Sequence, residues 1–124
     1  MTLGEALEEI DALRPNDCSR EEKLLWLSGA EEALLAEVFS GHEGVPCETF
    51  AGYDTSAPPD TPLLAQGPGS REVYLGWLEN RIDYWNGDTE RYNNSSLMLR
   101  AAWTAFARYW NRTHRPLAAA RRFR

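Results

Sequence analysis

The chain has 124 residues, 43% of them hydrophobic, and a formal net charge of −6. This length predicts one domain, and no apolar run approaches the ~18 residues that a membrane span needs. The acidic start, MTLGEALEEI, lacks the basic region of a signal peptide, so we expect a soluble protein that is made in the cytoplasm. Net acidity also argues against general nucleic-acid binding, which a basic stripe drives.

The charges are divided unevenly along the chain. Residues 1–60 carry 14 acidic and 3 basic residues, whereas residues 61–124 carry 5 acidic and 10 basic residues. Such a split predicts an oriented electrostatic surface. Two interpretations remain open: acidic and basic helices pair within one monomer, or they meet between subunits.

Two helices are predicted before residue 41. The first covers residues 2–13, where Thr2 and Glu5 form a capping box and Pro15 follows the end. The second begins at Ser19 with another capping box and continues to about Ser40, with Gly41 after it. Adjacent acids in these helices, such as Glu31 and Glu32, are interpreted as a solvated face.

Residues 41–69 have a different composition and predict a long connector. Five of the seven prolines lie here, and a connector of this length is usually functional or mobile. The apolar residues that we expect to anchor it on the core are Phe50, Tyr53, Leu63 and Leu64. A short hairpin around Phe50 is an alternative.

Two further helices are predicted after the connector. One begins at Ser70 as its cap and ends near Trp85, with Arg81 placed to stack on Trp77 or Tyr84. The other begins after Asp88 and covers about Thr89–Thr113. Its first apolar stripe is Tyr92, Ser96, Leu99, Trp103, Phe106 and Trp110, and its second is Asn94, Met98, Ala102, Ala105 and Tyr109.

These two stripes make an apolar face wider than the usual 100°. The helix is therefore either the centre of a bundle or shared with another subunit. Trp103 is expected in the core, and Asn94 is expected to be a buried amide bonded to loop backbone. The whole pattern predicts an all-α, four-helix bundle-like domain over residues 1–116 and a basic tail over residues 117–124.

Sequence motifs of enzyme chemistry are missing. There is no GxxxxGK[ST] phosphate loop, no GxGxxG and no GxSxG, and the two cysteines and two histidines lack metal-ligand spacing. A Cys47–His114 pair is conceivable, but nothing local activates the Cys47 thiol. We therefore expect no enzymatic activity, no metal and no cofactor.

Residues 74–116, YLGWLENRIDYWNGDTERYNNSSLMLRAAWTAFARYWNRTHRP, carry a family resemblance. They resemble the pattern YxxWLxxxIDYxNGExxRYNNS, followed by YxxFxxxYNRTHxP, of small helical proteins encoded in the head–tail module of tailed phages and prophages. The openings ALEEIDALRPN and SREEKLLWLS and the segment FAGY are also similar to that family. The chain departs from the pattern at Asp88 in place of Glu, and at Trp103 and Trp110 in place of Tyr.

This resemblance implies a head–tail connector (adaptor, or head-completion) protein. Such proteins form a ring beneath the portal after DNA packaging, so it implies a virion structural role at the head–tail junction, with the portal protein and neighbouring copies of the chain as partners. The residues that we expect to contact partners are Asn93, Arg100, Arg108, Asn111, Arg112 and His114. The residues that we expect to be structural are Tyr92, Asn94, Trp103, Phe106 and Trp110.

Some alternatives remain open. Asn111, Arg112 and His114 could instead form the helix C-terminus, where cations suit the dipole. Another head-module assembly role would be separated from the connector by gene order. A small DNA-binding regulator of a mobile element would use the four arginines on the wet side of the last helix, Arg91, Arg100, Arg108 and Arg112.

Overall fold

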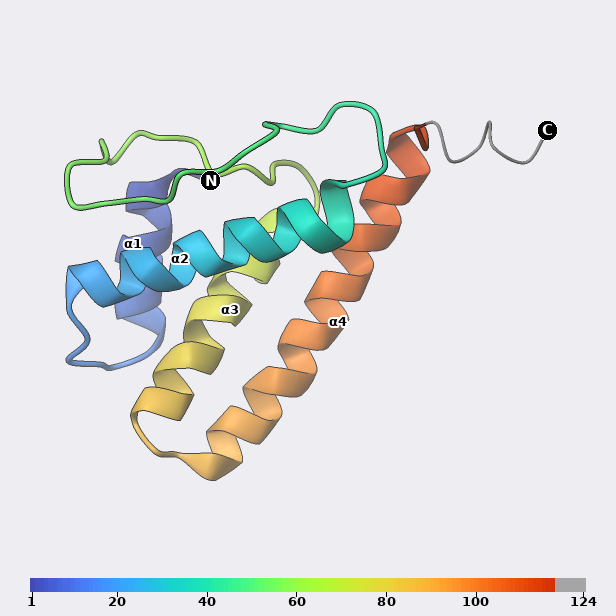
Figure 1. Ribbon diagram of the computed structural model, residues 1–124. Coiled ribbons are helices and arrows are strands. Elements are labelled where there is room, and N and C mark those ends of the chain that lie inside the picture. Colours follow the sequence, from blue (N-terminus) through green and yellow to red (C-terminus); the bar gives the residue numbers. More distant parts are fainter. Residues whose placement is uncertain (118–124) are drawn as a thin grey trace.

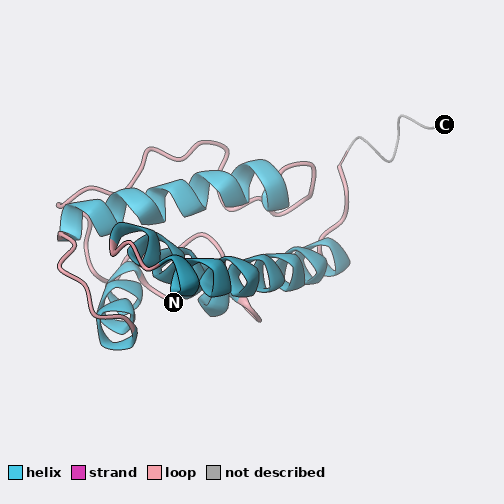
Figure 2. Cartoon of the chain, turned by 90° about the horizontal axis from the view of Figure 1, so that it is seen from below, coloured by secondary structure: helices cyan, strands magenta, loops and turns pink. Residues whose placement is uncertain are grey.

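The predicted all-α class is confirmed by the computed structural model of the chain, which describes residues 1–117 (Figure 1). The predicted tail from residue 118 onward lies outside the described residues. The elements are α1 (Leu3–Leu13), α2 (Arg20–Leu34), a π-helical turn η1 (Leu35–Phe39), α3 (Ser70–Trp85) and α4 (Thr89–Thr113). Among the residues drawn in Figure 2 there are helices and loops but no strand.

Three predicted helix starts are confirmed by their caps. The Thr2 hydroxyl accepts a bond from the Glu5 amide while the Glu5 carboxylate accepts one from the Thr2 amide, which completes the capping box. Ser19 and Asp88 likewise accept bonds from the amides three residues on. The predicted Ser70 cap is wrong: Gly69, at φ +85°, holds the cap position, and the Ser70 hydroxyl donates to the Gly67 carbonyl at 2.8 Å.

The end of the second helix differs from the prediction. The α-helix stops at Leu34 and the backbone widens into the π turn, whose last bond runs from the Ser40 amide to the Leu35 carbonyl at 3.0 Å. This turn leaves Phe39 fully buried against α4. Its ring makes edge contacts with Phe106, at 6.2 Å between centroids, and with Trp110, at 4.4 Å.

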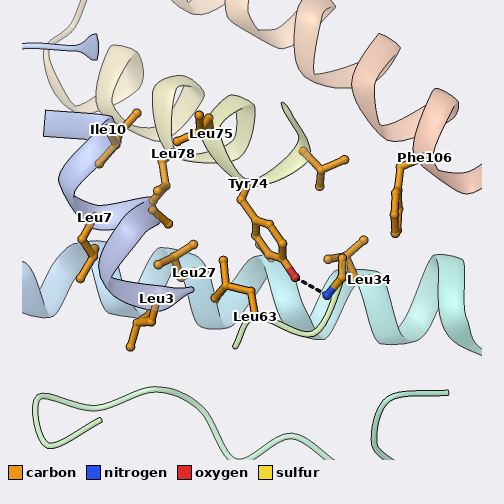
Figure 3. Packing of buried hydrophobic residues seen from close by; sticks show 14 of the residues in the cluster. Leu3, Leu7, Ile10, Leu27, Leu34, Leu63, Tyr74, Leu75, Leu78 and Phe106 are labelled. Atoms are coloured by element: carbon orange, nitrogen blue, oxygen red, sulfur yellow. Dashed lines mark hydrogen bonds between the residues drawn. The ribbon is translucent and has the colours of Figure 1, made fainter. Parts of the chain in front are cut away.

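The helices pack around one apolar core. α3 and α4 form a helical hairpin, α2 crosses it, and α1 packs on α3 (Figure 1). Figure 3 shows α1 and α2 side chains converging on α3 and on the connector residue Leu63. The largest fully buried apolar side chains are Leu3, Ile10, Leu24, Leu27, Leu34, Phe39, Leu63, Tyr74, Leu78, Ile82 and Phe106.

The connector between η1 and α3 crosses the N-terminal end of α1. Backbone bonds join Leu3 to Thr61 and Gly4 to Pro59, both at 2.8 Å. Gly4 permits this approach, since a Cβ there would lie 2.9 Å from the Pro59 carbonyl oxygen. The hairpin alternative around Phe50 is wrong, because only isolated bridges occur among residues 1–117. Of the expected anchors, Leu63 is buried, while Phe50, Tyr53 and Leu64 are half-buried.

α4 lies at the edge of the molecule, so of the two alternatives for this helix the bundle centre is wrong, and contact with another subunit stays a prediction (Figure 1). It packs on α3 and on η1, and only Ser95, Phe106 and Trp110 of its 25 residues are buried. Trp103 is half-buried beside Trp77, with 5.8 Å between ring centroids, so its predicted core position is also wrong. Most of the second predicted stripe of α4 is open to solvent.

We predict that Phe106→Ala destabilises the fold by about 3–5 kcal/mol, because it empties a fully enclosed site. Trp103→Ala should cost only about 1–2 kcal/mol, since that ring is partly hydrated in the folded state. Urea unfolding of both variants measures the difference. Equal losses would contradict the edge position of α4.

Candidate functional site

A buried carboxylate joins the connector to the helices. Glu31 of α2 is fully buried and accepts three hydrogen bonds. The Tyr53 hydroxyl donates at 2.5 Å, the Leu64 amide at 2.8 Å, and the Tyr74 hydroxyl of α3 makes a further short bond. Two of these donors belong to the connector, so Glu31 ties that segment to α2 and α3.

The network continues through two hydroxyl groups. The Tyr74 hydroxyl accepts from the Ala65 amide at 2.7 Å (dashed line, Figure 3). The Ser28 hydroxyl accepts from the Tyr53 amide at 2.8 Å and donates to the Leu24 carbonyl at 2.9 Å. Three connector amides, at Tyr53, Leu64 and Ala65, thus bond to side chains of the helices. Together, Glu31, Ser28, Tyr53 and Tyr74 form what we call the Glu31 network.

Burial dominates the electrostatics of this network. It raises the pKa of Glu31, and the bonds from Tyr53, Tyr74 and Leu64 oppose that rise only in part. Burial and the neighbouring carboxylate also raise the pKa of Tyr53 and Tyr74, so both phenols remain protonated donors. The arrangement suits a structural tether.

The prediction of a solvated Glu31–Glu32 pair is wrong for Glu31, whereas Glu32 is exposed. A signal for this was available in the sequence. Glu31 stands seven residues after Leu24 and four after Leu27, which places it on the apolar stripe of α2. The aromatic donors that satisfy it lie 22 and 43 residues away in the chain, and no local pattern predicts that contact.

A second tether holds the end of α1. The Arg14 guanidinium forms ion pairs with buried Asp83 at 2.9 Å and with Glu79 at 2.8 Å, both on α3. The Asn86 side chain donates to the Pro15 carbonyl at 3.3 Å. Asp83 and Asn86, two residues of the resemblance pattern, are therefore accounted for by packing inside the monomer.

The start of α4 is fixed by an amide from α3. The Asn80 side chain donates to the Tyr92 carbonyl at 3.2 Å and also bonds to the hydroxyls of Ser95 and Ser96. The Tyr92 ring contacts Tyr84 at 5.7 Å between centroids. Asn94 is exposed, so the prediction of a buried Asn94 amide is wrong.

The segment NRTHRP is divided between two roles. His114 caps α4, and its ring stacks on Trp110 with 3.4 Å between centroids and 10° between planes. Beyond it, the Arg115 carbonyl accepts from the Glu43 amide at 2.8 Å. This position makes His114 part of the helix end. Asn111 and Arg112 are exposed.

The outer face of α4 gathers five of the six predicted partner residues. We call them the cationic strip: Asn93, Arg100, Arg108, Asn111 and Arg112. All five are exposed, and none of the three arginines forms an ion pair within residues 1–117. Leu97 and Met98, which are 64% and 73% exposed, lie beside them on α4. No acidic residue follows Glu90 in this helix.

Residues 1–117 contain no cluster of three or more side chains that could hold a metal ion. Their helices lack the length and the apolar character of a membrane span. Cys18 and Cys47 are free, and burial raises the pKa of the Cys18 thiol. No family model, curated protein or solved structure matches the chain.

We predict that Tyr74→Phe destabilises the fold by about 1–3 kcal/mol, because it leaves the Ala65 amide and one Glu31 acceptor without a partner. Tyr84→Phe is the matched control, since that side chain is 69% exposed and should have little effect. Denaturant unfolding compares the two variants. Equal stability of both would contradict the tether.

Glu31 also predicts a pH dependence. Because its native pKa is raised above the ordinary 4.5, the folded state keeps this proton to higher pH than the unfolded chain does. The contribution of Glu31 to stability is therefore fully present below the ordinary pKa of 4.5, and it is lost as pH rises through the raised native pKa.

The variant Glu31→Gln cannot titrate at this position. The unfolding free energy of wild type minus that of Glu31→Gln should therefore fall as pH increases from about 4 to 8. All other titrating groups are common to both proteins and largely cancel. A flat or rising difference would show that the hydrogen bonds to the ionised Glu31 carboxylate offset the effect of burial on its pKa.

Proposed function

We propose that the chain is a structural protein of a tailed phage or prophage virion, and that it acts as a head–tail connector subunit docking to the portal ring and to neighbouring copies of itself. The observation that carries the proposal is the cationic strip: exposed arginines that have no ion partner within residues 1–117, on a helix at the edge of the molecule. A ring subunit needs surface of this kind, available outside its own core.

The distribution of tethers supports this assignment. Several residues of the resemblance pattern, including Asp83, Asn86 and His114, hold helix ends inside the monomer. Arg100, Arg108 and Arg112 form no ion pair within residues 1–117. Their arrangement along one face is accounted for by a partner of opposite charge, since charged groups across an interface fix register and steer encounter.

A DNA-binding regulator is the second candidate. Arg100 and Arg112 are separated by about 18 Å along α4 at 1.5 Å per residue, a length over which several phosphates could be contacted. Arg91 is less available, because it pairs with Asp88 at 3.6 Å. The formal charge of −6 disfavours this candidate, and salt-sensitive duplex binding would be its signature. Another head-module assembly role would be separated by gene order.

The decisive experiment uses the portal protein of the same phage or prophage. We predict that Arg108→Ala/Arg112→Ala leaves the thermal melt close to that of wild type, because exposed cations near a helix end contribute only about 0.3–1 kcal/mol each. Portal capture and the yield of infectious particles in a complementation assay should nevertheless fall by at least about tenfold, since central interface contacts are worth roughly 2 kcal/mol or more.

Glu8→Ala/Glu48→Ala is the matched control, because it removes two exposed charges far from α4 in sequence. It should leave both readouts unchanged. Normal capture and normal yield with the arginine variant would reject the cationic strip as the partner surface. Failure of the wild-type chain to bind the portal at all would reject the connector function.

A further inference from the structure

A second strip, of opposite charge, lies along the outer face of α2. Glu21, Leu25 and Glu32 are exposed and spaced by four and seven residues, so they share one side of the helix. We call them the acidic strip. Leu25 is 69% exposed and lines an open hollow of about 540 Å³ between α2 and the connector, as does Asp54. Neither Glu21 nor Glu32 forms an ion pair in the described part of the chain.

The two strips carry opposite charges and are similar in length. An exposed leucine accompanies each: Leu25 lies between the two acids of the acidic strip, and Leu97 lies beside the cationic strip, before Arg100. Glu21 and Glu32 are separated by about 16 Å along their helix, and Arg100 and Arg112 by about 18 Å, at 1.5 Å per residue. The Asp54 carboxyl stays ionised at neutral pH, because hydrogen bonds from Ser56 lower its pKa.

We infer that the acidic strip of one copy receives the cationic strip of a second copy. The partner is assigned by charge complementarity: the chain itself presents both faces, and within residues 1–117 neither face neutralises the other. Because two different patches meet, the contact is heterologous and repeats from copy to copy until a ring closes. This inference deepens the connector function proposed above and rests on it.

Paired charge reversals test the contact. One variant is Arg100→Glu/Arg112→Glu, which makes both strips acidic, and the other is Glu21→Arg/Glu32→Arg, which makes both strips basic. Alone, each variant would place like charges opposite one another. In an equimolar mixture every contact regains opposite charges, because each variant offers the strip that the other requires.

Sedimentation equilibrium at low salt, from micromolar to millimolar protein, measures the mass. The wild-type mass should rise above the 14.1 kDa monomer as concentration increases. Each variant alone should associate at least about tenfold more weakly, and the mixture should regain wild-type association. Circular dichroism of each variant should match that of wild type, as a check that both variants are folded.

Glu8→Arg/Glu48→Arg is the matched control for net charge. Alone, it should associate as strongly as wild type, because both of its strips are unchanged, whereas Glu21→Arg/Glu32→Arg, which changes the net charge equally, should not. Equally weak association of these two glutamate variants would overturn the inference, because net charge rather than the acidic strip would then decide association, and so would a wild type and an equimolar mixture of the two strip variants that stay monomeric throughout.

Three further outcomes separate this inference from the connector function. If wild type binds duplex DNA and Arg100→Glu/Arg112→Glu does not, the cationic strip belongs to nucleic acid and the inference fails. If the portal captures wild type while charge reversal leaves self-association unchanged, the connector function stands and this subunit contact is rejected. If the mixture associates as expected but the portal does not bind, the contact stands and the connector function falls.

Discussion

The buried Glu31 carboxylate is the interaction on which the arrangement of this molecule depends most. The connector has no repeating backbone pattern of its own, so it must be held by specific contacts. Glu31 supplies acceptors for Tyr53, Leu64 and Tyr74, and Tyr74 in turn accepts from Ala65. These bonds fix the connector where Leu63 and Ala65 enter the core. A carboxylate without these donors would be costly there, because desolvation of a charge is offset only by bonds of good geometry.

Much of the helical framework was predictable, because helix ends are encoded locally. Thr2, Ser19 and Asp88 mark their helices through bonds that span three residues. The errors arise where distant segments decide the outcome. Glu31 is buried because the connector covers it, whereas Asn94 is exposed and it is Asn80 of α3 that bonds to the start of α4. Trp103 was expected in the core because periodicity shows which residues share a face, but not how much of that face a neighbour covers.

The same limit applies to the candidate site. The sequence placed Asn93, Arg100, Arg108, Asn111 and Arg112 on the wet side of the last helix, and all five are exposed. The sequence alone could not separate His114 from these five residues, because its stacking on Trp110 is set by the geometry of the C-terminal end of α4. The sequence alone could not separate the acidic strip from the adjacent glutamates of α2, because the packing of the connector and α3 decides which faces of α2 stay exposed. Glu21 and Glu32 of the acidic strip and the arginines of the cationic strip form no ion pair within residues 1–117, which is the physical basis for expecting contacts between copies.

The central claim is that the Glu31 network holds the connector as firmly as the helices that it joins. Amide hydrogen exchange at neutral pH tests this most directly, since exchange reports local opening of each bond. The backbone amides of Tyr53, Leu64 and Ala65 all donate to groups of the network. They should exchange as slowly as amides in the middle of α2 and α3. Exchange at the rate of an open loop would contradict the account, because the connector would then be loose in solution and Glu31 would lack its partners.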